Sequence, residues 1–291
     1  MTSKSSTHEW TVFDAESDTS RVLHEVAREA RCAVICGLPA AGKSLVLREL
    51  SLIARQYQRT IHGLRWDVSR QPFDRPEFLA RFPEIQNATH PVLRRAAGLW
   101  VRKALAAWFT RNSHPAHLLV IEAPLVGGRF VELAVREADE AEENLAGEAT
   151  RFLVLIPSRE VRNAVELARA RESSRPTHAL NAKDAPPPLV NALWEDLLEA
   201  ARALKILHEK SHLIEYSPDI YGAVYAKVLH DRHVTLVSVS QIVSLPGSAH
   251  EIAGGILDVI PTSSEVDQYM SKAEAYGVEE AMRLTSQWYA R

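Results

Sequence analysis

The stretch that decides the fold, CAVICGLPAAGKSLVLREL (residues 32–50), joins three segments of different character. Residues 32–36 form a short apolar run, as expected for a buried strand. The loop GLPAAGKS (residues 37–44) follows, and residues 43–56 then have the apolar spacing of a helix. A strand, a glycine-containing loop and a helix in this order predict one unit of an α/β domain with a mainly parallel sheet.

The loop itself fits the phosphate-binding pattern G-x-x-x-x-G-K-[ST] at every position. Its glycines allow backbone amides to approach a phosphate, and the helix that follows adds partial positive charge at its start. Lys43 is predicted to reach the β- and γ-phosphates of a nucleoside triphosphate, and Ser44 to ligate Mg²⁺. The alternative is a plain glycine turn. The expected nucleotide-binding residues are Gly37, Leu38, Pro39, Ala40, Ala41, Gly42, Lys43, Ser44 and Leu45.

Composition limits the class of protein. The chain has 291 residues, 46% hydrophobic and 24% charged, as in a soluble globular protein, and its net charge of −3 gives no general footprint for duplex nucleic acid. Cys32 and Cys36 would lie roughly 13 Å apart on one strand, too far for a disulfide. The polar start and the absence of a long apolar run favour a cytoplasmic protein without a membrane segment.

Apolar periodicity predicts the remaining elements. Further strands are expected over residues 60–68, 117–122, 151–156 and 233–243, and helices over 20–30, 130–147, 189–210, 219–231 and 264–289. We expect a tail and helix at 1–30, a main domain at 31–245, and a C-terminal loop and helix at 246–291 packed on that domain. Within the main domain, 68–116 would be a helical acceptor-binding insert. Residues 159–188 would be a lid, with Ser158 capping its first helix.

Two carboxylates are candidates for chemistry. Glu122 ends the third apolar run, where a carboxylate could support Mg²⁺ or act as a base; the alternative is a surface glutamate. Asp67 follows the second strand, and ligands gather beyond the carboxyl ends of parallel strands. It is a candidate base for an acceptor hydroxyl, or else a capping residue. Arg70 and Arg129 could reach a substrate anion.

Arginines form two further groups. Arg162 and Arg169 share one face of the helix after the fourth strand and could cover transferring phosphates when the lid closes. The alternative is a solvated face on which Arg162 pairs with Glu166. A second group in the insert could bind an anionic acceptor or form a solvated face: Arg94, Arg95, Arg102 and Lys103.

Residues 208–212 spell HEKSH, which matches the H-E-x-x-H pattern of zinc peptidases. A chain with 12 histidines produces such a match by chance far more readily than it produces the phosphate loop. We therefore favour solvated histidines near a helix end over a metal site.

Together, GLPAAGKS, Asp67 in RWDVSR, LLVIEAPL and the arginines after RFLVLIPS resemble the nucleotide-kinase-like group of P-loop NTPases. This group includes nucleoside, nucleotide, gluconate, shikimate and dephospho-coenzyme A kinases. The resemblance covers residues 30–245. It implies a three-layer P-loop NTPase fold with a mainly parallel five-stranded sheet, order 2-3-1-4-5, and helices on both faces. Glu122 departs from the commoner aspartate.

The resemblance implies an ATP- and Mg²⁺-dependent phosphotransferase acting on a small hydroxylated metabolite, a nucleoside or a nucleotide. Its catalytic residues would be Lys43, Asp67, Glu122, Arg162 and Arg169, with Ser44 and Glu122 at the metal. The expected partners are a nucleoside triphosphate and a small-molecule acceptor, without nucleic acid or membrane; a homodimer is left open. Two alternatives are an ATPase switch that docks a protein through residues 137–148 and the tail, and a kinase of nucleic-acid ends.

Overall fold

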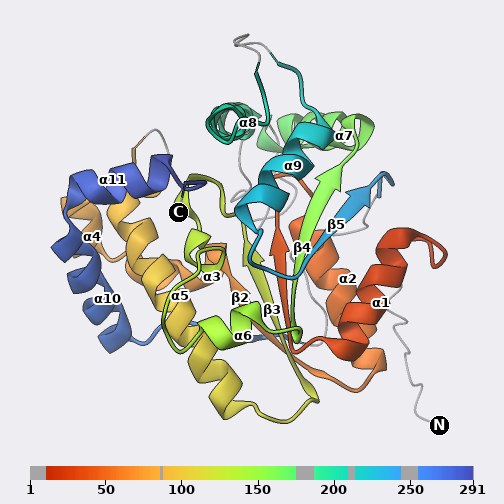
Figure 1. Cartoon of the computed structure of the whole chain (residues 1–291), viewed down its shortest axis with the longest axis horizontal. Coiled ribbons are helices and arrows are strands. Elements are labelled where there is room, and N and C mark those ends of the chain that lie inside the picture. Colours follow the sequence, from red (N-terminus) through yellow and green to blue (C-terminus); the bar gives the residue numbers. More distant parts are fainter. Residues whose placement is uncertain (1–10, 86–87, 175–186, 209–213, 244–254, 291) are drawn as a thin grey trace.

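A single, largely central sheet organises the computed structural model of the chain, which describes residues 11–85, 88–174, 187–208, 214–243 and 255–290 (Figure 1). Within these ranges the sheet has six strands in the order β5-β4-β1-β3-β2-β6, and all neighbouring pairs are parallel. The strands are β1 (Cys32–Cys36), β2 (Thr60–Arg65), β3 (His117–Ala123), β4 (Thr150–Pro157), β5 (Val234–Val239) and β6 (Leu257–Asp258).

The prediction of five strands is therefore short by one. The five expected strands do follow the order 2-3-1-4-5, and β6, from the C-terminal segment, lies outside β2. Gly63 allows this close approach, since a Cβ placed there would lie 2.5 Å from the side chain of Ile256. A two-residue exposed strand carries no apolar run, which is why the sequence pattern missed it.

Helices cover both faces of the sheet, so the expected α/β class is confirmed (Figure 1). The helices are α1 (Asp18–Glu29), α2 (Lys43–Gln56), α3 (Trp66–Ser69), α4 (Pro76–Arg81), α5 (Pro91–Arg111), α6 (Glu142–Ala146), α7 (Arg159–Ser174), α8 (Pro187–Ala203), α9 (Pro218–Val228), α10 (Ser263–Tyr276) and α11 (Val278–Ser286), with 3-10 helices η1 (Gln71–Phe73), η2 (Val126–Gly128) and η3 (Val131–Leu133). Among the described helices, none combines the length and the apolar character needed to cross a bilayer.

Alternation along β1 divides the core in two. Ala33 and Ile35 pack with α1 and α2, whereas Cys32, Val34 and Cys36 face the cluster that contains α5, α8, α9 and α10. Both cysteines are free and buried, as expected. Because β1 is buried on both faces, the residues that follow it must emerge at the carboxyl edge of the sheet, between the two helical layers.

The C-terminal segment covers the insert helix α5. Val266, Tyr269, Met270 and Ala273 of α10 belong to the same buried cluster as Trp100 of α5. This explains why α5 is apolar around much of its surface. The single helix expected at 264–289 is instead two helices, because the chain turns at residue 277, a glycine with a φ of +83°.

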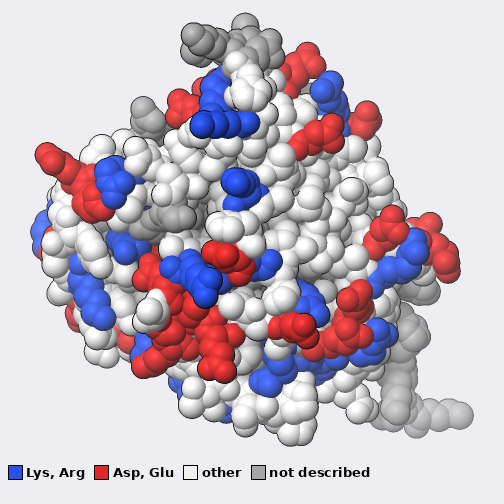
Figure 2. Space-filling view, in the orientation of Figure 1, with Lys and Arg blue, Asp and Glu red and all other residues white. Residues whose placement is uncertain are grey.

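The acidic helix expected over residues 130–147 does not form, and only η3 and the five-residue α6 are helical there. Arg102 donates to the carbonyl oxygens of Glu132 and Val135, and Arg232 donates to those of Leu133 and Val135. These carbonyls would otherwise accept intrahelical bonds, so the buried guanidinium groups compete with the helix. Figure 2 shows acidic side chains crowded around α6 with basic side chains among them.

Glu142 holds this region together, and its titration predicts a pH dependence of stability. Burial would raise its pKa, but hydrogen bonds from Arg232 and Arg102 outweigh burial and lower the pKa of Glu142 from 4.5 to about 2. A lowered carboxyl pKa stabilises the fold at pH above 4.5, and this contribution is lost as the pH falls toward 2.

We therefore expect Glu142→Gln to lower the free energy of unfolding by about 3 kcal/mol at neutral pH. The substitution removes the carboxylate that the two arginines stabilise and leaves the buried charge of Arg232 without its ion-pair partner. The difference from the parent should shrink as denaturation is measured at increasingly acidic pH below 4.5. Glu143→Gln, at the exposed neighbouring position, is the matched control and should have little effect at any pH. Equal effects of the two substitutions would contradict the assignment.

Candidate functional site

The loop between β1 and α2 passes three times through left-handed backbone. Gly37, Ala40 and Gly42 have φ values of +147°, +70° and +88°. Glycine adopts such angles freely, but Ala40 does so at a cost of about 1–2 kcal/mol. Strain of this kind persists where the surrounding structure over-determines the backbone, and it concentrates at functional sites.

This loop leaves several amide donors without acceptors. Among the described residues, no hydrogen bond is made by the amides of Gly42, Ser44 and Leu45 at the start of α2, or by the Ser44 hydroxyl. Lys43 is buried, and its Nζ donates to the Leu38 carbonyl at 3.0 Å. Amides at a helix start, a neighbouring ammonium and a hydroxyl fit the triphosphate and Mg²⁺ that the sequence pattern predicts.

Two stacked tyrosines of α9 brace the loop edge. The Tyr221 hydroxyl accepts a hydrogen bond from the Leu38 amide at 2.8 Å, and the Tyr225 hydroxyl donates to the Pro124 carbonyl at 2.8 Å. Their rings stack at 5.0 Å between centroids, and burial raises the pKa of both phenols, so both stay neutral. Helix α9 therefore ties the phosphate loop to the segment that follows β3.

We expect Tyr221→Phe to lower the free energy of unfolding by about 1–3 kcal/mol, because the buried Leu38 amide loses its acceptor. Chemical denaturation measures the change. Tyr57→Phe is the control, since the partner of its hydroxyl is His24, at an exposed site. A Tyr221→Phe protein as stable as the control would show that the bond contributes nothing.

Glu122 lies on the sheet face that α2 covers. Alternate residues of a strand point to the same face of the sheet, so Glu122 shares its face with Leu118 and Val120. Both of these residues belong to the buried cluster that includes α2. The side chain is half-buried, one residue before the end of β3. Its face is therefore that of the helix carrying Lys43 and Ser44, as a metal-supporting carboxylate requires.

Asp67 lies just beyond the strand end predicted for it. Strand β2 stops at Arg65, and Asp67 occupies the short helix α3, where it is exposed. Among the described residues its carboxylate accepts no capping hydrogen bond, so the capping alternative is wrong. Burial lowers the pKa of Arg129, and the Asp67 carboxylate partly opposes this effect, which places Asp67 and Arg129 within electrostatic reach.

The segment after β3 is strained as well. Leu125 and Phe130, at φ +64° and +60°, flank Gly127 and Gly128, which also have positive φ. The segment closes on itself through the Leu125 amide and the Arg129 carbonyl, 2.9 Å apart. Two strained loops thus follow the neighbouring strands β1 and β3 at the same edge of the sheet.

The arginines of the predicted lid are only partly described. Arg162 pairs with Glu166, as one alternative predicted, but it is buried, so the solvated face of that alternative is wrong for this residue. It also donates to the Val190 carbonyl at 3.4 Å and lies over the Tyr216 ring. It therefore links α7 to α8. The side chain of Arg169 and residues 175–186, in the middle of the predicted lid, lie outside the described residues.

In the insert, three of the four basic residues form ion pairs within the chain. Arg95 meets Glu132 at 2.7 Å, Arg102 meets Asp139 at 2.6 Å, and Lys103 meets Glu140 at 2.6 Å. Arg95 and Arg102 are buried, so a fully solvated face is wrong for them. Arg94 differs, because its partners among the described residues are backbone carbonyls alone.

The H-E-x-x-H pattern finds no support in the described residues. Helix α8 ends at Ala203 instead of residue 210, and His208 is exposed beyond that end. Residues 209–213 lie outside the description. Elsewhere in the described chain, no group of three or more histidine, cysteine, aspartate or glutamate side chains could hold a metal ion.

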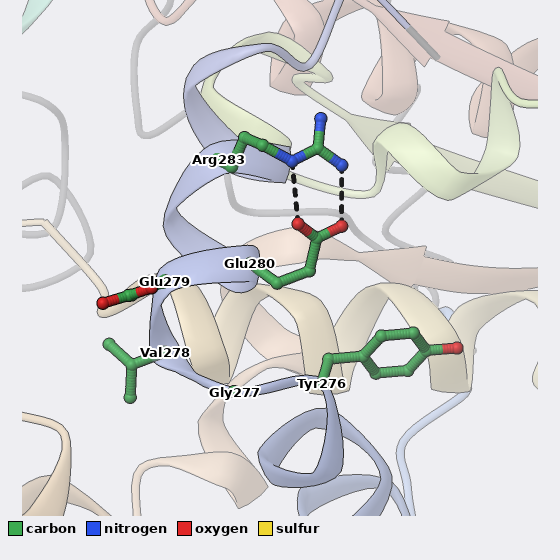
Figure 3. A pocket seen from close by; sticks show the side chains of 6 residues that line it. All are labelled: Tyr276, Gly277, Val278, Glu279, Glu280 and Arg283. Carbon is green, nitrogen blue, oxygen red and sulfur yellow. Dashed lines mark hydrogen bonds and ion pairs between the residues drawn. The ribbon is translucent and has the colours of Figure 1, made fainter.

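Two surface hollows lie away from the phosphate loop. One, of about 520 Å³, sits where α10 meets α11; Tyr276, Gly277 and Val278 line it, and the Glu280–Arg283 ion pair borders it (Figure 3). The other, of about 360 Å³, lies between α5 and α10 and includes Arg102 and Asp139. In both hollows charged groups already pair with each other, so neither offers a clear ligand site.

Comparisons with protein-family models, curated proteins and solved structures gave no match. The candidate site therefore rests on the motif and the geometry of this chain. Sequence reasoning missed the two tyrosines and the strain at Leu125 and Phe130. The i, i+4 spacing of the tyrosines was visible, but their partners come from distant segments.

Proposed function

We propose that the chain is a P-loop NTPase of the nucleotide-kinase-like group and that it transfers phosphate from ATP to a small hydroxylated acceptor. The observation that carries the proposal is loop 37–45, with its left-handed turns, with Lys43, and with the amides of Gly42, Ser44 and Leu45, which make no hydrogen bond among the described residues. The strand order 2-3-1-4-5 and the helices on both faces support the same fold assignment. The cytoplasmic location and the homodimer stay predictions.

The loop residues bind the donor. Amides at the start of α2 hold phosphate oxygens, and Lys43 releases Leu38 to reach the β- and γ-phosphates. Ser44 and Glu122 would hold Mg²⁺, which neutralises charge on the phosphates when bound. Tyr221 keeps Leu38 in place throughout, because its bond uses the amide and not the carbonyl.

Asp67 acts on the acceptor. The acceptor oxygen forms a bond to the γ-phosphorus, the bond from that phosphorus to the β,γ-bridging oxygen breaks, and ADP leaves. The acceptor hydroxyl proton passes to the Asp67 carboxylate, which is exposed and carries no other hydrogen bond among the described residues. Arg162 and Arg169 stay candidates for covering the transferred group.

The alternatives have less support. A kinase of nucleic-acid ends would grip the strand with the arginines of residues 94–103, but Arg95 and Arg102 form ion pairs with carboxylates of the same chain. The acidic residues 137–148, which the ATPase-switch alternative would use to dock a protein, include the ion-pair partners of Arg102 and Lys103. Both observations weigh against these two alternatives.

Incubation with γ-labelled ATP, Mg²⁺ and a metabolite pool tests the proposal. We expect label in a small product, and Lys43→Ala should abolish its formation because the phosphates lose their main cation. Label in free phosphate alone would favour the ATPase switch, and label on an oligonucleotide the end kinase. Lys103→Ala, on the exposed pair with Glu140, is the control and should retain the parental rate.

Asp67→Asn should reduce kcat by about 10²–10⁴-fold while leaving the affinity for ATP unchanged, since a general base contributes on that scale. Single-turnover kinetics with the labelled product gives the rate. Glu77→Gln, at an exposed acidic position of α4, is the control for loss of a nearby negative charge. An Asp67→Asn enzyme with parental kcat would remove Asp67 from the mechanism.

A further inference from the structure

Two buried arginines converge beside the candidate site. Arg94 comes from the first turn of α5 and Arg129 from the strained segment after β3, and each is only 8% exposed. A Cβ added at Gly127 would lie 2.8 Å from Nη1 of Arg129 and 3.2 Å from Nη1 of Arg94. Both guanidinium groups therefore surround the same glycine, which needs its positive φ and its lack of a side chain.

Their hydrogen bonds leave donors open. Arg94 donates from Nε to the Thr89 carbonyl at 2.6 Å and from Nη1 to the Gly127 carbonyl at 2.7 Å; Arg129 donates from Nη1 to the Val126 carbonyl at 3.0 Å. Among the described residues, no acceptor meets Nη2 of Arg94 or Nε and Nη2 of Arg129. None of these three nitrogens is sealed from solvent.

Other buried arginines of the chain are arranged differently. Arg95, Arg102 and Arg232 each lie within 3 Å of a carboxylate oxygen, whereas no described carboxylate forms an ion pair with Arg94 or Arg129. Arg59, equally buried and bonded only to carbonyls, has its unbonded Nε sealed from solvent. Open donors thus set Arg94 and Arg129 apart.

The electrostatics favour an anion between them. Burial, then the charge of Arg129, lowers the pKa of Arg94 to about 9, and burial lowers the pKa of Arg129 as well. A guanidinium group keeps its proton in proteins at neutral pH, so both arginines carry a positive charge. The carboxylates of Asp196 in α8 and of Asp67 act on these arginines through space without forming an ion pair. The two positive charges of Arg94 and Arg129 are therefore only partly neutralised by the described residues. An oxyanion would satisfy the open donors and the charge together.

We propose that Arg94 and Arg129 form an oxyanion-binding site that holds a carboxylate or phosphate group of the acceptor. This rests on the proposed function, since Asp67 and the phosphate loop lie at the same edge of the sheet. The acceptor is then an anionic metabolite, bound by one end here and phosphorylated at a hydroxyl near Asp67. A neutral sugar or nucleoside would leave the guanidinium groups unpaired.

Calorimetric titration of the Lys43→Ala protein with inorganic phosphate, and separately with malonate, tests the site at constant ionic strength. The Lys43→Ala background weakens anion binding at the phosphate loop. We expect binding of at least one probe, and a loss of about tenfold or more in affinity on adding Arg129→Gln or Arg94→Gln. Adding Arg59→Gln instead, the matched buried control, should leave the affinity unchanged.

Arg129→Lys keeps the charge but removes the planar fork, so it should weaken binding several-fold even if the glutamine variants fail to fold. A preference for malonate identifies a carboxylate acceptor, and a preference for phosphate a phosphorylated one. Affinity that survives every Arg94 and Arg129 substitution, or no binding of either probe, overturns the site. The titration contains no nucleotide, so its result does not depend on phosphate transfer. Anion binding in the titration, together with no labelled product in the γ-labelled ATP assay, would refute the proposed function and leave the anion site standing.

Discussion

Burial of β1 on both faces is the constraint on which the rest of the structure depends. A five-residue strand at the centre of a parallel sheet cannot shift its register, because its two faces pack against different helical layers. The residues after its carboxyl end therefore lie at one fixed place, where the amides of Gly42, Ser44 and Leu45 make no hydrogen bond to any described residue. Everything proposed for the site follows from that placement.

The neighbouring elements hold the edge in position. Helix α9 spans the loops after β1 and β3 through two tyrosine hydroxyls, one on an amide and one on a carbonyl. The C-terminal helices cover α5, which in turn carries Arg94 to the strained segment after β3. Segments far apart in the chain thus meet at one edge, and the strain at Ala40, Leu125 and Phe130 is borne by their packing.

Much of the fold was predictable because its signals are local. Apolar runs predicted the five main strands, and the loop pattern correctly predicted a turn between a strand and a helix, which is where residues 37–42 lie. The prediction of a helix over residues 130–147 was wrong for a physical reason. The composition of this segment favours a helix, but Arg102 and Arg232 donate hydrogen bonds to its carbonyl oxygens. Strand β6 was not predicted because two exposed residues show no apolar periodicity. Its position depends on packing against Gly63 of β2.

The sequence by itself determined the α/β class, the five main strands and the turn between β1 and α2 that carries the predicted phosphate-binding pattern, since each depends on neighbours within one strand, turn or helix. Only the tertiary structure decided which charged residues are free to act. Arg95, Arg102 and Arg94 look alike in sequence, yet carboxylates from distant segments neutralise the first two, whereas no described carboxylate forms an ion pair with Arg94. Pairing of a buried charge depends on side chains brought together across the fold, and spacing along one helix carries no record of it.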